Sequence, residues 1–326
     1  VRMTTHWPST KLGDVIDLFD SQRIPLNSRQ RQERQGKFPY YGAQGIIDYI
    51  DDYIFDGRYI LVAEDGENLN SKKLPLALFA TGKFWVNNHA HILRGKANIA
   101  DDTYLLACLN NADIKPFVTG AAQPKLSQGN LRLIEIPLPP LPIQQRIAGI
   151  LSAYDELIEN SQRRIKLLEA MARALYREWF VHFRFPGHEN HPRVPSPRGE
   201  IPQGWEVKAV AEAFTISGGG TPSRKESAYW EGGTIQWYSP SDLTGAGTMF
   251  MDDSSDHITE RGLEQSSARM FPPRSVMLTS RATIGAIAIN THPACTNQGF
   301  ITCLPNKHVP LYFLFHWLTE NVPTFQ

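Results

Sequence analysis

One stretch of the chain concentrates the side chains that read base edges in DNA. Arginine and glutamine alternate within residues 21–37, a polar segment that also contains proline and glycine. Arginine matches the O6 and N7 acceptors of guanine, whereas glutamine matches the N6 and N7 atoms of adenine. The candidates for base contacts are Arg29, Gln30, Arg31, Gln32 and Arg34. The same composition is typical of a solvated polar loop, so the residue types alone leave both interpretations open.

A glycine-rich segment at residues 217–225 offers a second kind of nucleic-acid contact. Its three consecutive glycines resemble a phosphate-binding loop, but the Gly-Lys-Ser/Thr ending of a P-loop and the glycine spacing of a dinucleotide motif are both missing. A flexible loop whose amides, Thr221, Arg224 and Lys225 contact DNA fits the composition better. A plain turn fits it about equally well.

Three further cations stand near predicted turns or strand ends. Lys83 follows a glycine and Lys125 follows a proline. We expect both to contact phosphates, which position a protein on DNA without reading its sequence. Arg281 comes shortly after an apolar strand pattern, where it would either reach a phosphate or cap the strand end.

The sequence predicts neither a metal centre nor a catalytic site. His89 and His91 alternate as in a strand, so both rings would face one side, but no further ligands are evident. His188 and His191 lie among prolines and lack the spacing of the helical His-Glu-x-x-His motif. The base-holding motif of adenine methyltransferases, Asn/Asp-Pro-Pro-Tyr/Phe, is also missing. We therefore expect no catalytic residue, metal or cofactor in this chain.

Bulk composition excludes little. Lys+Arg and Asp+Glu number 33 each, so the net charge is zero and a nucleic-acid partner has to be recognised by local patches. Cys108, Cys295 and Cys303 lack paired metal-ligand spacing, which indicates free thiols in a reducing cytosol. No apolar run approaches the ~18 residues that cross a bilayer. We expect a cytoplasmic protein without a membrane partner.

One long periodic helix organises the elements that must position these side chains. Between residues 147 and 179, apolar side chains recur at alternating intervals of four and three, the a/d pattern of a coiled coil. The predicted subunit-interface seam consists of Ile147, Leu151, Tyr154, Ile158, Ile165, Leu168, Leu175 and Trp179. At 1.5 Å per residue the helix is roughly 50 Å long. Two copies are expected to pair their helices as a homodimer, unless the missing partner helix lies outside this sequence.

Proline-rich borders divide the chain into four segments, namely residues 1–142, a spacer helix at 143–184, a linker at 185–200 and residues 201–326. The motif Ile-Pro-Leu-Pro-Pro-Leu-Pro at 136–142 is expected to be non-helical, because each proline removes a hydrogen-bond donor. The linker is predicted from its proline and glycine content alone.

The first and last segments look like divergent copies of each other. Each opens with a tryptophan, continues through a polar loop and apolar strand patterns, and ends in a helical stretch at 101–109 or 310–318. Strands followed by a helix predict an α+β fold, with two similar domains separated by a long coiled-coil helix. The second copy lacks a counterpart of residues 118–142, so we expect it to be incomplete at its C-terminus.

The border and the helix carry a family resemblance. The motif at 136–142 continues as Ile-Gln-Gln-Arg-Ile-Ala, and further motifs are Gly-Gly-Gly-Thr-Pro at 218–222, Thr-Ser-Arg-Ala-Thr-Ile-Gly at 279–285 and Gly-Ala-Ala-Gln-Pro-Lys at 120–125. In type and order these motifs closely resemble the specificity (HsdS) subunits of type I restriction-modification systems. The main departure is a second long helix, which family members pack antiparallel to the first and which this sequence lacks.

The resemblance implies a non-catalytic subunit of a DNA methyltransferase and endonuclease complex. Each of two target-recognition domains would read one half of a split site in double-stranded DNA, and the helix would space them. Methyltransferase subunits, which carry S-adenosylmethionine, would dock on this scaffold, and a restriction/translocase subunit would join for cleavage. The segment at 21–37 then falls in a recognition domain, which favours base contacts over a merely solvated loop.

Two other classes of protein are alternatives to this one. A coiled-coil assembly protein whose globular ends bind protein is compatible with zero net charge, although the duplicated Arg/Gln- and Gly-rich segments favour DNA. A methyltransferase or nuclease with its own activity is disfavoured, because no cofactor or base-holding motif is present. Salt-dependent binding to a bipartite duplex would separate the DNA-binding and protein-binding classes.

Overall fold

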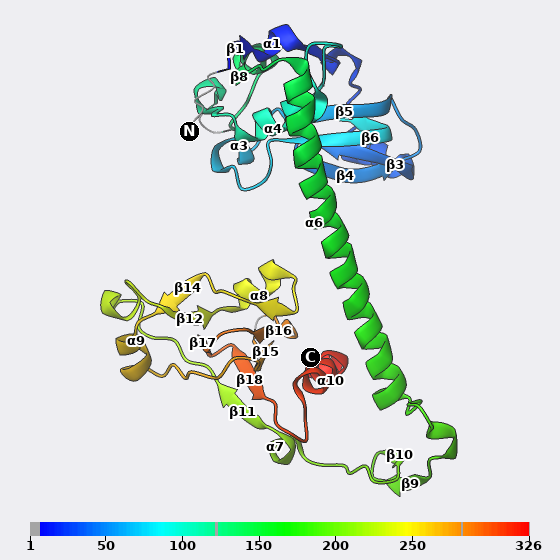
Figure 1. Ribbon diagram of the computed structural model, residues 1–326, viewed down its shortest axis with the longest axis vertical. Helices are drawn as coiled ribbons and strands as arrows, with labels where there is room; N and C mark the ends of the chain where they lie inside the picture. The colour runs from blue at the N-terminus through cyan, green and yellow to red at the C-terminus, as the bar shows by residue number, and fades with distance from the viewer. Residues whose placement is uncertain (1–6, 121–122, 282, 326) are drawn as a thin grey trace. The chain divides into compact units, whose positions relative to one another are not determined.

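The computed structural model describes residues 7–120, 123–281 and 283–325. They form two compact units, within residues 1–163 and 164–326, and the boundary lies inside one long helix. Two alanines of the motif at 120–125 and one of the motif at 279–285 lie outside the described residues. Each unit combines a mixed sheet with short helices, so the predicted α+β class is confirmed (Figure 1).

The first unit is built on a six-stranded sheet with the order β2-β7-β5-β6-β3-β4, while β1 and β8 pair separately. The strands are β1 (Ser9–Lys11), β2 (Ile16–Leu18), β3 (Gln35–Gly42), β4 (Gly45–Ile50), β5 (Phe55–Ala63), β6 (Ala77–Val86), β7 (Ala90–Gly95) and β8 (Glu135–Pro137). The helices are α1 (Leu12–Val15), α2 (Ser28–Glu33), α3 (Asn68–Ser71), α4 (Asp102–Asn111) and α5 (Gln128–Leu133), with 3₁₀ turns at Asp20–Gln22 and Lys115–Phe117. Leu12, Leu105 and Leu131 of three helices pack in one core with Ile60 and Leu93 of the sheet.

The second unit has a five-stranded sheet with the order β11-β18-β15-β16-β13 and a three-stranded sheet with the order β14-β12-β17. The strands are β9 (Arg193–Ser196), β10 (Gly199–Pro202), β11 (Thr215–Gly218), β12 (Ile235–Tyr238), β13 (Phe250–Met251), β14 (Asp256–Ile258), β15 (Val276–Thr279), β16 (Ile287–Asn290), β17 (Ala294–Thr296) and β18 (Phe300–Leu304). The helices are α7 (Val210–Ala213), α8 (Pro240–Ala246), α9 (Glu260–Glu264) and α10 (Leu311–Phe325), with 3₁₀ turns at His188–Asn190 and Ser227–Tyr229. Leu314 and Leu318 of α10 pack on Val276 and Ile289 of the larger sheet.

Strand order identifies the two units as copies of one arrangement. Two series of four strands correspond, β2-β7-β5-β6 in the first unit and β11-β18-β15-β16 in the second. In each series all three neighbouring pairs are antiparallel. The turns that precede β7 and β18 are also closed alike. The Oδ1 atom of Asn87 accepts the amide of His89 at 2.8 Å, and that of Asn297 accepts the amide of Gly299 at 2.8 Å. The predicted duplication is therefore confirmed at the level of single hydrogen bonds.

The long helix predicted from the heptad pattern is α6, which spans 36 residues from Leu141 to Tyr176 and ends in a π-helical turn at Arg177–Val181. Its start corrects one expectation, because Leu141 and Pro142 are helical. A proline in the first turn of a helix replaces an N–H group that would have no partner there. In the part of the chain that the structure describes, neither α6 nor any other helix is long and apolar enough to cross a membrane.

Gln144 attaches the start of α6 to the first unit. Its side chain is fully buried, accepts the amide of Asp101 at 3.0 Å, and donates to the carbonyls of Ile99 and Pro139 at 3.0 and 2.8 Å. A buried amide that is bonded in this way strongly resists displacement, because each lost partner would leave a desolvated polar atom.

The segment predicted as a plain linker contains structure of its own. Strands β9 and β10 pair as a short antiparallel hairpin, and the ring of Phe185 lies 6.3 Å from that of Trp205 in a stacked arrangement. Proline and glycine content marked this stretch as a linker, but tight turns use the same residues. The four segment boundaries stay predictions.

Candidate nucleic-acid interface

The Arg/Gln segment of the first unit contains a short helix, α2, where the sequence predicted a loop. The side chain of Asn27 accepts the amide of Gln30, and the side chain of Gln30 accepts the amide of Asn27, each at 2.9 Å. This capping box satisfies two N–H groups at the helix start. Both Gln30 and Gln32 are exposed, but the side-chain oxygen of Gln30 is engaged in the cap.

Arg31 fastens α2 to the edge strand β4. Its Nε atom donates to Asp48 at 3.0 Å, its Nη1 atom donates to the carbonyl of Leu26 at 2.8 Å, and its guanidinium lies 5.3 Å from the ring centre of Tyr40. Hydrogen bonds from Gln35 and from the backbone, together with Arg31, hold the pKa of Asp48 below its usual value. With only 19% of its side chain exposed, Arg31 is positioned more as a link than as a base reader.

Arg34 and Arg29 are more accessible than Arg31. The Nε atom of Arg34 donates to Asp51 at 2.9 Å, and its guanidinium lies 4.9 Å from the ring centre of Trp85. Arg29 pairs with Glu33 on the same helix at 3.0 Å, and 88% of its side chain is exposed. Of the five predicted base readers, Arg29, Gln30 and Gln32 are exposed, but the side-chain oxygen of Gln30 is engaged in the helix cap. Arg34 is partly exposed.

The glycine-rich segment of the second unit is packed against neighbouring backbone. The amide of Gly220 donates to the carbonyl of Thr296 at 2.8 Å, and the carbonyl of Gly220 accepts Nε1 of Trp237 at 2.9 Å. A Cβ atom at Gly220 would lie 2.2 Å from the carbonyl oxygen of Ser267. The expectation of a flexible loop is therefore wrong at this residue, since its amide is already bonded and its missing side chain permits a close approach.

The polar side chains that follow these glycines have partners as well. Thr221 donates to the side-chain oxygen of Gln298, and Arg224 forms an ion pair with Asp256 at 2.5 Å. The guanidinium of Arg224 lies 3.6 Å from the ring centre of Trp230. Just over half of the Arg224 side chain stays exposed despite these contacts. The remaining predicted cations of this unit, Lys225 and Arg281, are exposed.

The two predicted phosphate contacts of the first unit are lysines whose ammonium groups contact neighbouring side chains. Lys83 Nζ lies 4.4 Å from the ring centre of Tyr53, and hydrogen bonding with that tyrosine raises the pKa of Lys83. Lys125 Nζ lies 3.2 Å from a carboxylate oxygen of Glu64, and 54% of its side chain is exposed. Both ammonium groups are accessible, as a phosphate contact requires.

The apolar seam of α6 lies on the surface of the described chain. The exposed fractions run from 37% to 63% at Leu151, Tyr154, Ile158, Ile165, Leu168 and Leu175, and Ile147 and Trp179 are half-buried. Exposed aliphatic side chains in a regular seam are typical of an interaction surface.

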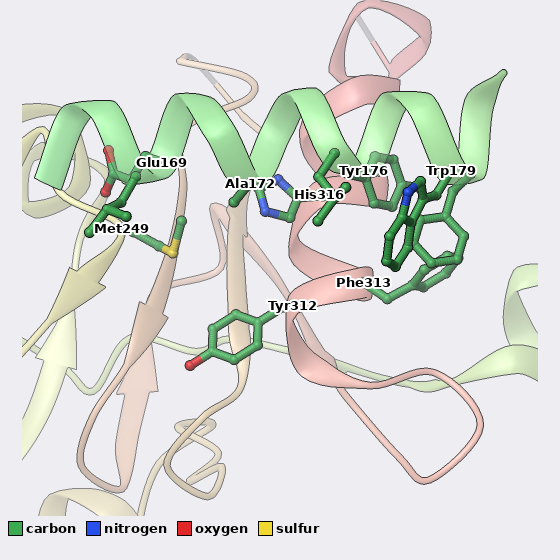
Figure 2. A pocket seen from close by; sticks show the side chains of 11 residues that line it. Glu169, Ala172, Tyr176, Trp179, Met249, Tyr312, Phe313 and His316 are labelled. Atoms are coloured by element: carbon green, nitrogen blue, oxygen red, sulfur yellow. The ribbon is translucent and has the colours of Figure 1, made fainter. Parts of the chain in front are cut away.

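In the second unit, the last turns of α6 and helix α10 line an apolar cavity of about 520 Å³. Figure 2 shows the rings of Tyr176, Trp179 and Phe313 gathered at one end of it, and the Tyr176 and Phe313 ring centres are 5.6 Å apart. His316 also lines the cavity, and its Nδ1 atom has no hydrogen-bond partner among the described residues. Burial, with a contribution from Arg173, holds the pKa of His316 below its usual value.

The match to known proteins follows the repeated units. A family model described as the type I restriction modification DNA specificity domain matches residues 5–170 and 202–325, one range for each copy. The chain belongs to this family. The family resemblance that the sequence motifs indicated is thereby confirmed.

Individual relatives agree with the family model. A putative type I restriction enzyme specificity subunit of Haemophilus influenzae is 37% identical over 147 residues, which cover 45% of this chain and 37% of that relative. The MjaIX specificity subunit of Methanocaldococcus jannaschii is 41% identical over 126 residues, or 38% of this chain and 29% of that relative. The matched regions thus span about a third of each relative's own length.

Among solved structures, the type I restriction-modification S subunit of M. genitalium superimposes with a TM-score of 0.61 at 15% sequence identity. The superposition covers 100% of this chain and 80% of that one. The fold of this specificity-family chain is thereby shown to be that of an S subunit, two similar domains with a long helix between them.

The first domain of this specificity-family chain also holds a buried charge network that sequence patterns did not reveal. Nδ1 of His91 lies 2.6 Å from Asp20, and Nε2 lies 2.8 Å from the carbonyl of Leu126. The Asp20 and His91 side chains are only 6% and 1% exposed. Burial favours the neutral form of Asp20, but the hydrogen bond and charge of His91, with help from Arg23, hold its pKa below the usual value.

Glu64 completes this network. It pairs with Arg23 at 2.8 Å and with Lys125 at 3.2 Å, and these cations together with His91 hold its pKa below the usual value against the effect of burial. The ligand atoms of Asp20, Glu64 and His91 lie within 4.8 Å of one another, close enough to suggest a metal site. The arginine and lysine already neutralise the carboxylates, however, and both ring nitrogens of His91 face oxygen atoms, so we interpret the group as an ion-pair network.

The sequence pattern of His89 and His91 drew attention to only one member of this network, His91. β7 begins at Ala90, so His89 lies in the preceding turn and the predicted strand alternation does not apply to it. His89 instead pairs with Asp65 at 2.7 Å. Residues 20, 64 and 91 are far apart in the sequence, and only the sheet brings them together, so no local signal could have identified the network.

Proposed function

We propose that this chain is the DNA-specificity subunit of a type I restriction-modification complex and that each domain reads one half of a bipartite site. The observation that carries the proposal is the duplication, one strand order used twice on either side of α6. Two similar readers on one chain are suited to two short sequences separated by a spacer. At 1.5 Å per residue, the 36 residues of α6 amount to about 54 Å of helix.

In this proposal the base contacts come from the accessible polar residues of each domain. Arg29, Gln32 and Arg34 serve the first domain, where Arg31 and Gln30 hold α2 in place. Thr221, Arg224, Lys225 and Arg281 serve the second domain. Lys83 and Lys125 contact phosphates, which fix the orientation of the protein on the duplex.

The seam of α6 is proposed to bind other subunits. Exposed side chains such as Ile158 and Ile165 offer a helical apolar stripe, which suits the methyltransferase subunits or the same helix of a second copy. The chain itself is proposed to have no catalytic activity. S-adenosylmethionine would be bound by the methyltransferase partner, and a restriction/translocase subunit would join the assembly for cleavage.

Methylome sequencing tests the proposal most directly. The chain is expressed with its methyltransferase partner in a host that lacks other adenine methylation, and methylated adenines are expected in one two-part motif. Replacing Arg29 and Gln32 by alanine should relax or change one half of that motif, and Arg224→Ala should affect the other half. Methylation without a two-part motif, or variants that leave both halves unchanged, would contradict the assignment.

Two controls separate the parts of the proposal. The purified chain alone should transfer no methyl group, and transfer without partners would show that it is an enzyme. The double variant Ile158→Asp, Ile165→Asp should abolish pairing of the seam in sedimentation experiments. A wild-type chain that sediments as a monomer at all concentrations would remove the homodimer and leave docking of the methyltransferase subunits as the role of the seam.

A further inference from the structure

Three candidate base-reading arginines share one local arrangement, in which an aromatic ring lies beside the guanidinium and an aspartate pairs with it. The three groups are Arg31 with Tyr40 and Asp48, Arg34 with Trp85 and Asp51, and Arg224 with Trp230 and Asp256. Arg31 and Arg34 lie in α2 and at its C-terminal cap in the first domain, whereas Arg224 lies in a turn of the second domain. A single structural need at one place in the fold therefore does not account for the arrangement.

Exposure separates these groups by role. The side chains of Arg31 and Asp48 are only 19% and 25% exposed, as expected for a structural link. Arg34 and Asp51 are 32% and 51% exposed, and the Arg224 and Asp256 pair is 52% and 42% exposed. In these last two pairs, the aspartate engages donors that remain within reach of DNA.

The chemistry of the pair makes the aspartate a competitor of the base. A carboxylate accepts from the same fork of N–H donors that binds O6 and N7 of guanine. The aromatic ring fixes the plane of the guanidinium, so a base that arrives in that plane can take over the donors without a large rearrangement. A phosphate has no such requirement for direction and is attracted by any free cation, whatever the sequence.

We infer that Asp51 and Asp256 are specificity-determining residues, which neutralise Arg34 and Arg224 until a correctly placed base edge replaces the carboxylate. This inference rests on the proposed function. Each aspartate lowers the affinity of its arginine for DNA of any sequence. A matching base edge regains that affinity by displacing the carboxylate, whereas a random sequence does not. Specificity is a difference of affinities, and weakening the wrong complexes raises it as surely as strengthening the right one.

The Arg224 and Asp256 pair provides the sharper test, because Asp52 lies 3.7 Å from Arg34 and would partly replace Asp51. Asp256→Asn is made in the full chain and compared with Glu159→Gln. Glu159 pairs with Arg163 on α6 at 2.9 Å, so this control makes the same change in net charge at another exposed ion pair, one that carries none of the aromatic stacking described above. Thermal unfolding verifies that both variants are folded.

Binding to a random-sequence duplex is measured across a range of salt concentrations. Asp256→Asn should bind about two- to fivefold more tightly, the size of one exposed ion pair. Its salt dependence should be steeper by about 0.9 in log–log slope, one additional phosphate contact. In a selection from a randomised duplex pool, Asp256→Asn should enrich the preferred sequence less than the wild-type chain does. The enrichment should fall by about the same two- to fivefold factor. On an Arg224→Ala background, Asp256→Asn should change nothing.

Several outcomes would overturn the inference. The inference fails if Asp256→Asn matches Glu159→Gln in affinity and slope, or if it acts equally on the Arg224→Ala background. It also fails if Asp256→Asn loses DNA binding altogether, because the aspartate then only supports the fold or the arginine. A wild-type chain that enriches no sequence from the pool would instead contradict the proposed function, independently of either aspartate.

Discussion

The two domains share a strand order but differ at one equivalent place. Leu18 pairs with Leu93 in the first domain, and Ile216 pairs with Cys303 in the second, which sets the residue correspondence between the copies. By this correspondence the charged residues Asp20, Glu64 and His91 are matched by Gly218, Ser280 and Ile301. One copy therefore places a buried ion-pair network where the other places a glycine, a hydroxyl and an aliphatic side chain.

The difference teaches what the shared fold requires. Strand pairing and apolar packing are retained in both copies, whereas the charged side chains at these three equivalent positions are not. In the first domain the network fastens a later segment, because His91 bonds the carbonyl of Leu126 and the amide of Leu126 bonds the carbonyl of Glu64 at 2.8 Å.

The largest effect is expected from Asp20→Ala, which removes the carboxylate that lies 2.6 Å from Nδ1 of the buried His91 ring. Removal of one partner from a buried ion pair costs about 3–5 kcal/mol of unfolding free energy. The loss should be confined to the first domain, as measured by denaturant unfolding with domain-resolved hydrogen exchange. Asp17→Ala, at an exposed position on β2, is the matched control and should change stability by less than about 0.5 kcal/mol. Equal effects of the two variants would show that the ion-pair network does not stabilise the first domain.

A smaller effect is expected in the second domain from Gly220→Ala. The new Cβ would meet the Ser267 carbonyl, and the required shift should cost about 1–3 kcal/mol. Gly218→Ala is the control, because a Cβ there has nothing within 4 Å. Calorimetry of both variants checks the prediction. Equal stability would mean that the glycines are not needed for close packing, and the flexible-loop interpretation would return.

The smallest effect is expected from acid. The folded-state pKa values of Asp20 and Glu64 lie below their ordinary values of 3.8 and 4.5, so ionisation favours the folded first domain. This stabilisation is complete above about pH 4.5 and is lost as the pH falls through the lowered values. Protection of each domain against hydrogen exchange, corrected for intrinsic rates, measures the loss between pH 6 and pH 3.

The second domain is the internal reference for the acid experiment. Its Asp242 also has a lowered pKa, because hydrogen bonds from Ser255 and Ser239 outweigh the effect of burial. Among the described residues of 201–326, the pKa is lowered for Asp242 and for the exposed Glu206. In the first domain it is lowered for Asp20, Asp48 and Glu64, and Asp20 and Glu64 belong to the buried network. A second domain that loses protection first as the pH falls would contradict the comparison.

Local patterns predicted a large part of the architecture. The heptad spacing gave α6, and the apolar run at 276–279 coincides with β15. The polar segment at 21–37 was predicted as a loop from its glycine, proline and polar composition, yet Asn27 and Gln30 form a capping box that starts α2. In this case the helix signal lay in the cap rather than in the helix itself.

For the candidate interface, the sequence indicated which side chains suit DNA but not which of them are available. Gln30 is engaged by its own helix cap, and Arg31 is nearly buried between β4 and Tyr40. Arg29 and Gln32 lie on the same helix and are exposed. For Arg31 the distinction depends on Asp48 and Tyr40 of two strands, which composition and spacing do not encode.

The sequence by itself determined the duplication, the α+β class, the long helix and the chemistry suited to base edges, because each of these rests on periodicity or on residue type. The tertiary structure decided which arginines are paired with aspartates and which are exposed. It also decided that Asp20, Glu64 and His91 meet, and that Gly220 packs against backbone. All of these depend on contacts between residues far apart in the chain, which form only when the sheets bring the strands together.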